Sequence, residues 1–296
     1  MGGIAMITLK NDYLTVKINP LGAELTSVKD NESGLEYMWQ ADKAYWGRHA
    51  PILFPIVGRL QDNQYRLNGE TYHMTQHGFA RDREFTIIDQ TDTQVSLELT
   101  ADDETKALYP QDFILTLSYE LVDHQLKVNA TVTNPTDEAM VFSFGAHPGF
   151  NVPFGGALAD FTDYNVTVSP KQTYQRVPLV GPYSDTKHSV PLDLHQPLSL
   201  KHDLFDHDAQ VLTLDNHETT VMLSTPSDDH GIALTVAAPY LGIWSPYPKQ
   251  APFVCLEPWW GLADDVQATG DLETKVAIQK LAGKDSFKAS YQITYF

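Results

Sequence analysis

Cysteine is nearly absent from this sequence, since Cys255 is the only one in 296 residues. A single cysteine excludes an internal disulfide and is typical of proteins that work in a reducing compartment. Apolar residues surround it, with Phe253 and Val254 before it and Leu256 after it. We therefore expect Cys255 to be a buried small side chain rather than a nucleophile.

Positive charge is also scarce. The chain has 20 Lys and Arg residues against 38 Asp and Glu residues, which gives a formal net charge of −18. Such a surface repels phosphate, so we expect neither nucleic acid nor an anionic membrane as a partner. Long apolar runs and a signal peptide are missing as well, which predicts a soluble, cytoplasmic protein. Met6 is a plausible alternative start, and residues 1–5 are predicted to be a non-native or disordered extension.

The common cofactor and metal motifs are missing. The sequence contains no HExxH, CxxC, GxGxxG, GxxxxGK[ST] or GxSxG, so the usual zinc, dinucleotide, nucleotide and serine-hydrolase sites are not indicated. His73 and His77 are four residues apart, but they follow a hairpin signal and not a helical pattern. We expect no metal and no cofactor.

What the sequence has in abundance is period-two alternation of apolar and polar residues. Short alternating runs recur along the whole chain and are separated by turn residues, among them Asn68-Gly69, a strong hairpin signal. Residues 102–108 are the one candidate helix, and residues 177–198 are predicted to be a proline-interrupted excursion over the surface. This pattern predicts an all-β fold, a large antiparallel sandwich or barrel, with residues 1–296 in a single domain.

Residues 143–151, with the sequence SFGAHPGFN, place a histidine between two glycines and before a proline. Pro148 has no N–H for a sheet ladder and restricts His147 to extended or turn geometry. We therefore expect a strand to end at His147 and to present its imidazole, a group suited to proton transfer near neutral pH. The alternative is a packed histidine that bonds a neighbouring loop.

A second candidate group is Glu257, which follows an apolar run and precedes Trp259 and Trp260. A carboxyl in such surroundings has a raised pKa and is a better base near neutral pH. The two tryptophans would stack on the apolar face of a sugar. The alternative is that Glu257 pairs with Arg59 and that both tryptophans are core residues.

These stretches together resemble a known family. His77-Gly78, residues 145–150 (GAHPGF), residues 204–209 (LFDHDA) and residues 255–259 (CLEPW) are similar in order and wording to the aldose 1-epimerase (galactose mutarotase) family, and most of all to its LacX-like branch. The resemblance implies a large antiparallel β-sandwich, the galactose mutarotase-like supersandwich. It also implies a cofactor-independent enzyme that interconverts the α and β anomers of an aldohexose such as galactose or glucose.

The resemblance implies a role for each matching residue. Glu257 resembles the general base that takes the proton of the C1 hydroxyl, and His147 the general acid that protonates the ring oxygen. His77 and Arg59 resemble groups that bind sugar oxygens and stabilise developing charge. In residues 204–209, Asp208 is preferred over Asp206 as the anchor for sugar hydroxyls, and Trp259 is expected to contact the sugar.

Three matters stay open at this point. A related branch acts on hexose 6-phosphates, for which Arg48, Arg81 and Arg83 would be the phosphate ligands unless they pair with Asp82 and Glu84 at the surface. A non-catalytic sugar-binding protein on the same fold is the other alternative, and the protein is expected to be a monomer or a homodimer. The remaining candidate histidines are expected to be surface groups: His49, His73, His202 and His207.

Overall fold

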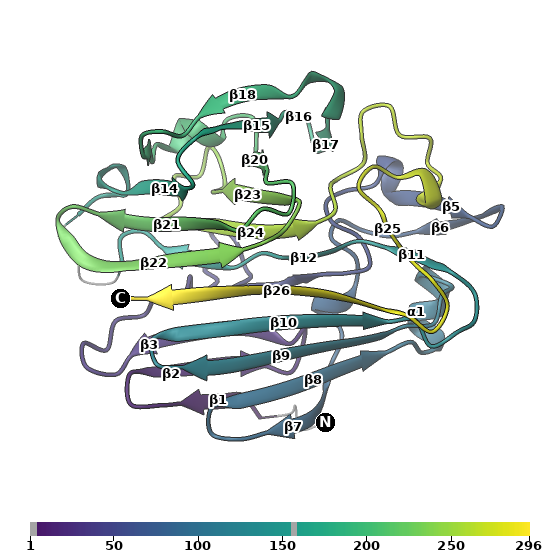
Figure 1. Cartoon of the computed structure of the whole chain (residues 1–296), viewed down its shortest axis with the longest axis horizontal. Coiled ribbons are helices and arrows are strands. Elements are labelled where there is room, and N and C mark those ends of the chain that lie inside the picture. The colour runs from purple at the N-terminus through teal and green to yellow at the C-terminus, as the bar shows by residue number, and fades with distance from the viewer. Residues whose placement is uncertain (1–4, 155–158) are drawn as a thin grey trace.

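A nine-stranded antiparallel sheet forms one layer of a β-sandwich in the computed structural model, which describes residues 5–154 and 159–296. Figure 1 shows this sheet in front. Its strands, in spatial order, are β19 (Leu198–Ser199), β14 (Asn165–Ser169), β21 (Thr219–Thr225), β22 (Asp228–Val236), β26 (Ser286–Tyr295), β10 (Gln125–Thr133), β9 (Ile114–Val122), β8 (Gln94–Thr100) and β7 (Thr86–Gln90).

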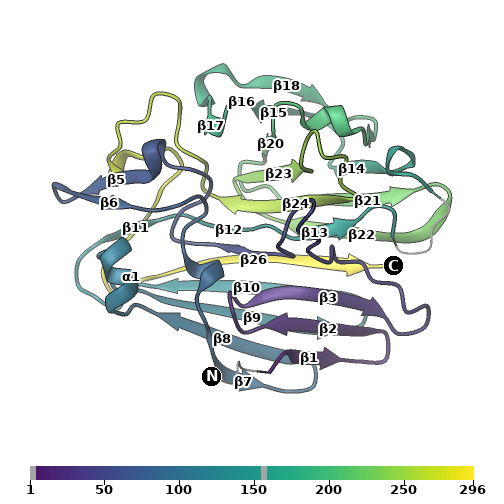
Figure 2. The same cartoon turned by 180° about the vertical axis from the view of Figure 1, so that it is seen from behind.

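Two further sheets lie against this layer, as the reverse view in Figure 2 shows. The smaller one contains β1 (Ile7–Lys10), β2 (Leu14–Asn19) and β3 (Glu24–Asp30) and lies over β8 to β10. The larger one runs in the order β18 (Val190–Asp193), β15 (Thr173–Val177), β20 (Gln210–Thr213), β23 (Tyr240–Trp244), β24 (Phe253–Trp260), β12 (Phe144–Ala146) and β4 (Ile52–Leu53), with β13 (Gly149–Asn151) also paired to β24. These sheets confirm the predicted all-β sandwich.

Short elements complete the chain. The strand pairs are β5 (Gln64–Leu67) with β6 (Glu70–His73), β11 (Met140–Phe142) with β25 (Gln279–Leu281), and β16 (Leu179–Val180) with β17 (Tyr183–Ser184). The helix α1 (Asp103–Leu108) is capped by Asp102, whose side chain accepts a hydrogen bond from the Thr105 N–H. The 3₁₀ turns are Gln61–Asn63, Ala80–Asp82, Phe161–Asp163, Thr186–His188, His202–Phe205 and Leu272–Thr274. The predicted hairpin at Asn68-Gly69 and the predicted short helix are both confirmed.

Alternation along the strands determines which side chains enter the core. In β9, Leu115, Leu117, Tyr119 and Leu121 are buried, while the residues between them remain partly exposed. Successive side chains of a strand point to opposite faces, so a strand such as β9 contributes one apolar row to the interior. The core cluster includes residues from β1 through β26.

The prediction for residues 177–198 is right about the surface and wrong about the strands. Most of the segment is exposed or half-buried, but it contains β16, β17 and β18, and β18 is the edge strand of the eight-stranded sheet through its pairing with β15. Pro191 is tolerated there because an edge strand has one side free of ladder hydrogen bonds. The prolines that suggested a loop instead mark this edge.

Pro258 lies inside β24, which has neighbours on both sides. The N–H of Leu256 donates to the Pro148 carbonyl at 3.2 Å, and the nitrogen of Pro258, two residues later, points to the same side. On that side the ladder is interrupted between β12 and β13, so the missing N–H leaves no bond unmade. A central strand therefore accommodates a proline beside the corner that carries His147.

Residues 1–4 lie outside the described residues, which leaves the prediction for the N-terminal extension open; Ala5 is exposed. The division into a single domain of residues 1–296 also stays a prediction. Of the helices that the described residues form, none combines the length and the apolar composition needed to cross a bilayer.

Candidate active site

Strand register brings His147 to Glu257. Gly145 in β12 pairs with Trp259 in β24, and Gly149 in β13 pairs with Cys255. His147 lies midway between the two glycines, and Glu257 lies midway between their partners. Side chains at opposed positions of an antiparallel pair share one face of the sheet, so the imidazole and the carboxyl emerge together. As predicted, β12 ends at Ala146, immediately before His147.

The two glycines beside His147 leave room for aromatic rings on that face. A Cβ at Gly145 would lie 2.9 Å from Cδ1 of Trp259, too close for any side chain. A Cβ at Gly149 would lie 3.3 Å from both Trp39 and Trp46. The GAHPG pattern thus permits a histidine to be enclosed by tryptophans.

The His147 and Glu257 side chains form a buried pair. Nε2 of His147 lies 3.0 Å from Oε2 of Glu257, and the two side chains are 9% and 1% exposed. Burial raises the pKa of the Glu257 carboxyl well above its ordinary value, and the nearby Asp208 carboxylate raises it further. Burial also lowers the pKa of His147 to about 3. These opposite shifts favour an uncharged carboxylic acid facing a neutral imidazole, a form in which the pair shares one proton.

His77 is the third ionisable side chain that lines the cavity beside this pair. Its ring stands edge-on to that of His147, with the centroids 5.6 Å apart. The Gly58 N–H donates to Nδ1 of His77 at 3.0 Å, so the proton of the neutral ring is on Nε2. Burial lowers the pKa of His77 well below its usual value, and the neighbouring cationic groups add to this effect. His77 is thus a neutral N–H donor.

Gly58 requires its glycine for two reasons. Its φ of +73° lies in the left-handed region, and a Cβ would lie 2.5 Å from Cα of Ala263. This backbone also carries Arg59 into the cavity, where its guanidinium donates to Oε1 of Gln76 at 3.1 Å. Arg59 therefore reaches the site as predicted. It does not pair with Glu257, because its partner is Gln76 and the partner of Glu257 is His147.

Asp208 lies at the rim of the cavity with a φ of +70°, and its Oδ1 accepts the N–H of Ala209 at 2.8 Å. The side chain is open to solvent, yet enough protein surrounds the carboxyl that burial raises its pKa. Asp206 lies in the adjoining depression and is 50% exposed beside His207. The structure thus places Asp208, and not Asp206, in the cavity with His147 and Glu257.

One cavity of about 350 Å³ unites all six residues selected from the sequence: Arg59, His77, His147, Asp208, Glu257 and Trp259. They come from the segment after β4, the segment after β6, the corner between β12 and β13, the turn before β20 and the central strand β24. Concave sites lined by aromatic residues with a few convergent polar groups are typical of small-molecule binding. The His147–Glu257 pair and His77 can donate protons to a bound polar molecule and accept protons from it.

The sequence analysis missed two tryptophans of this cavity. The Trp46 ring lies against His147 with centroids 4.8 Å apart, and Trp244 stands edge-on to His147 at 5.5 Å. Trp244 lies on the sheet face of Glu257 because Trp244 pairs with Cys255 and Gly242 pairs with Glu257, a register that the sequence alone does not reveal. Trp46 had no sequence signal either, since it lies in an irregular loop.

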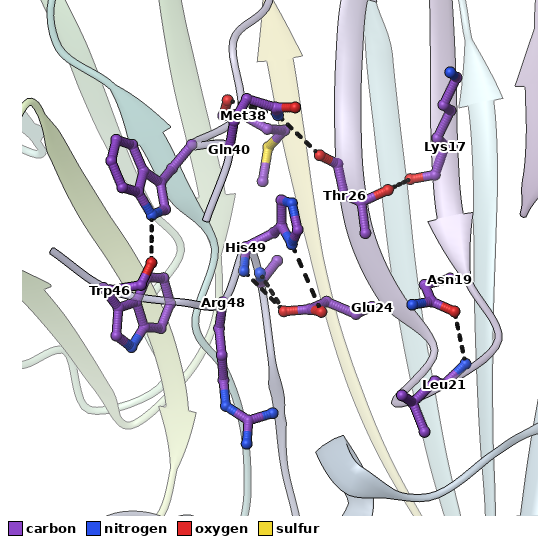
Figure 3. Close-up of polar contacts among 12 residues, drawn as sticks. Lys17, Asn19, Leu21, Glu24, Thr26, Met38, Gln40, Trp46, Arg48 and His49 are labelled. Carbon is purple, nitrogen blue, oxygen red and sulfur yellow. Dashed lines mark hydrogen bonds and ion pairs between the residues drawn. The ribbon is translucent and has the colours of Figure 1, made fainter. Parts of the chain in front are cut away.

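Hydrogen bonds to β3 and to the segment that follows it hold the loop with Trp46 in place, as Figure 3 shows. The indole N–H of Trp39 donates to the Trp46 carbonyl at 2.9 Å. One carboxylate oxygen of Glu24 accepts the N–H groups of His49 and Ala50 at 2.9 and 3.1 Å. These bonds fix the aromatic cover over His147.

Trp260 does not reach the cavity, so the expectation that both tryptophans stack on a sugar is wrong for it. It alternates with Trp259 along β24 and packs on Phe144 in the main core.

The arginines also differ in part from expectation. Arg48 pairs with Asp82 at 2.8 Å, and Arg83 pairs with Glu104, not with Glu84. Arg81 lines the cavity, and it also lies 3.8 Å from Asp82 and donates to the Gln76 carbonyl at 2.6 Å. Among the histidines expected at the surface, His73 and His207 are exposed, whereas His49 and His202 are half-buried.

A third group lies beside the buried pair. A ring nitrogen of His147, the Sγ of Cys255 and a carboxylate oxygen of Glu257 all lie within 4.8 Å of one another. Cys255 itself is fully buried, as predicted.

Comparison with known proteins identifies the family of this chain. The sequence model of the aldose 1-epimerase family matches residues 5–268. The chromosomal LacX protein of Lactococcus lactis subsp. lactis is 35% identical over 97% of this chain and 98% of its own. A galactose mutarotase related enzyme from Lactobacillus acidophilus superposes with a TM-score of 0.96 at 38% identity, covering 99% of this chain and 97% of that one. A galactose mutarotase-like protein from Lactobacillus casei ATCC 334 gives 0.90 at 36%, covering 99% and 100%. The chain therefore belongs to the aldose 1-epimerase family.

Proposed function

We propose that the protein is an aldose 1-epimerase that interconverts the α and β anomers of an aldohexose such as galactose or glucose. The observation that carries the proposal is the contact of 3.0 Å between Nε2 of His147 and Oε2 of Glu257 on the wall of the cavity. A binding protein needs no proton donor and proton acceptor side by side in a buried place, whereas ring opening needs both.

In the proposed reaction the pair carries one proton throughout. The reactive form has this proton on His147, which it reaches from Glu257 across their contact. Glu257 takes the proton of the C1 hydroxyl while His147 protonates the ring oxygen, and the C1–O5 bond breaks to give the free aldehyde. After rotation about C1–C2, the C5 hydroxyl attacks the other face of the aldehyde. His147 regains its proton, and Glu257 returns a proton to O1. Protons and electrons balance without any further reactant.

The neighbouring residues are assigned supporting roles. The Nε2–H of His77 donates to the sugar oxygen on which charge develops, because its Nδ1 is already engaged by Gly58. Arg59 and Asp208, which line the same cavity, bind sugar hydroxyls, and the indole of Trp259 packs on the apolar face of the ring. An Arg59→Ala variant is expected to lose both affinity and turnover.

A hexose-6-phosphate 1-epimerase is the second candidate, and Arg81 favours it. This side chain lines the cavity, and burial together with the nearby Arg48 lowers its pKa to about 10. In a chain of net charge −18, two guanidinium groups, Arg59 and Arg81, face the cavity that holds the pair. Such a site attracts a phosphate that the rest of the surface repels.

The two candidates separate in one experiment. Saturation transfer between the anomeric proton signals of an equilibrated sugar measures exchange directly, and galactose, glucose and their 6-phosphates are compared. We expect exchange with the free sugars to survive in Arg81→Met, while a selective loss of the phosphate reaction would select the second candidate. Binding of a sugar without faster exchange would contradict both and favour a non-catalytic sugar-binding protein.

A further inference from the structure

The proposed mechanism leaves Cys255 unused, although its thiol lies beside the reacting pair. Cys255 and Glu257 are two residues apart on β24, so their side chains leave the strand on the same face. His147 reaches that face from the corner between β12 and β13, and one donor atom from each residue lies within 4.8 Å of the other two. All three side chains are buried.

This triple escapes a sequence search for metal motifs because its parts are distant in the chain. His147 is more than one hundred residues from Cys255, and the pattern C-x-E is not a motif in itself. The register between β24 and its two neighbours alone brings the groups together.

The donor set is one nitrogen, one sulfur and one oxygen. Such a set suits borderline cations such as Zn²⁺ and Co²⁺, which take imidazole, thiolate and carboxylate ligands in tetrahedral geometry. With metal–ligand bonds of about 2.0–2.3 Å, the donor atoms of a tetrahedron are roughly 3.4 Å apart. His147 and Glu257 are already 3.0 Å apart. Small rotations of the His147, Cys255 and Glu257 side chains would bring all three donor atoms to this tetrahedral spacing.

One polar atom of this triple has no hydrogen-bond partner. Nδ1 of His147 is buried and unpartnered among residues 5–154 and 159–296, whereas Oε2 of Glu257 faces Nε2 of His147 at 3.0 Å. A buried polar atom without a partner is uncommon in folded proteins and calls for an explanation. A cation between the three side chains would take lone pairs from a ring nitrogen, the thiolate and the carboxylate oxygen.

We propose that His147, Cys255 and Glu257 bind a divalent cation of the Zn²⁺ type, with the fourth coordination position open to the cavity. Binding displaces one proton from the thiol and one from the carboxyl. The cation, the thiolate, the carboxylate and the neutral imidazole then sum to zero charge, which suits a buried place. Because the cation occupies the two groups assigned to proton transfer, it excludes sugar turnover; this consequence depends on the proposed function, whereas the binding itself does not.

Co²⁺ is the probe for this site, added to the full-length, reduced protein without oxygen. A tetrahedral site gives visible absorption bands, and thiolate ligation gives a charge-transfer band in the near ultraviolet. Since Cys255 is the single cysteine of the chain, this band can come from no other residue. We expect one equivalent of Co²⁺ to produce both sets of bands and one equivalent of Zn²⁺ to abolish them.

Variants identify the ligands. Cys255→Ser is expected to lose the charge-transfer band, and Glu257→Gln to bind at least about tenfold more weakly. His230→Asn is the matched control, because His230 pairs with Asp228 at 2.7 Å on the surface and away from any thiol. It should retain the band.

If a variant fails to fold, the Co²⁺ titration of the wild-type protein still tests the metal site. Co²⁺ binding without a thiolate band, or no binding at micromolar metal, would overturn the inference. The outcome is distinct from that of the proposed function: a protein that shows the band but does not accelerate anomer exchange would retain the metal site and lose the epimerase assignment. A protein that accelerates exchange and binds no cation would do the reverse.

Discussion

The pH dependence of turnover tests the state of the His147–Glu257 pair. The proposed reaction requires one shared proton, so activity is lost where the pair holds either two protons or none. A second proton enters only as pH falls toward the lowered pKa of His147, about 3. The last proton leaves only as pH rises through the raised pKa of Glu257. The structure therefore predicts a wide plateau through mildly acidic and neutral pH, followed by a fall at alkaline pH.

The steepness of the alkaline fall in kcat/KM follows from the loss of a single proton. Above the pKa of Glu257, kcat/KM should drop about tenfold for each pH unit. The assay is polarimetry from about pH 4 to about pH 10, with the uncatalysed rate subtracted at each pH because free sugars also mutarotate through acid and base catalysis. Far-ultraviolet circular dichroism at each pH verifies that the fold persists.

An ordinary carboxylate base would behave differently. Its rate would rise as pH increases through the ordinary Glu pKa of 4.5, and an ordinary histidine would give a step near 6.5. A rise between about pH 4 and about pH 5, or a step near neutrality, would refute the one-proton pair.

Four further predictions concern single variants. Glu257→Gln and His147→Asn should each lower kcat by about 10²–10⁴-fold, the usual contribution of a general acid or base, and Glu120→Gln on the outer face of β9 should change nothing. Glu257→Gln should also be at least as stable to urea as the wild type at alkaline pH: its folded pKa is raised, so the stabilisation from the protonated carboxyl is full at low pH and is lost as pH rises through that pKa, while the amide stays neutral. Asp208→Asn should raise KM for the sugar whereas Asp206→Asn, outside the main cavity, should not, and equal effects would contradict the assignment of Asp208. Lys275→Met should cost about 3–5 kcal/mol in urea unfolding, because it strands Asp264 from a buried pair at 3.1 Å, whereas Lys284→Met at an exposed pair should cost at most about 1 kcal/mol.

The fold was predictable where local patterns decide it. Alternation is strong in strands such as β9 and β10, and Asn68-Gly69 fixes its hairpin through two residues that accept positive φ. The strands within residues 177–198 were missed because prolines have opposite meanings in a loop and at a sheet edge. Only the pairing of β18 with β15, which no local pattern encodes, distinguishes the two.

The candidate site was predictable by residue and not by arrangement. Proline and glycine neighbours pointed to His147, and apolar neighbours pointed to Glu257, but their contact depends on register between strands more than one hundred residues apart. The same long-range register explains why Trp244 was missed and why Trp260 was wrongly expected to contact sugar. Trp46 depends on hydrogen bonds to Trp39, and its loop on Glu24, which the sequence does not reveal.

The central claim is that the buried pair interconverts anomers, and the most direct test is optical rotation. Freshly dissolved α-galactose and α-glucose are followed to equilibrium with the wild-type protein, with Glu257→Gln and without protein. We expect a faster approach to the same final rotation with the wild-type protein and a rate with Glu257→Gln close to the uncatalysed one. An unchanged rate with the wild-type protein, for these sugars and for their 6-phosphates, would contradict the claim.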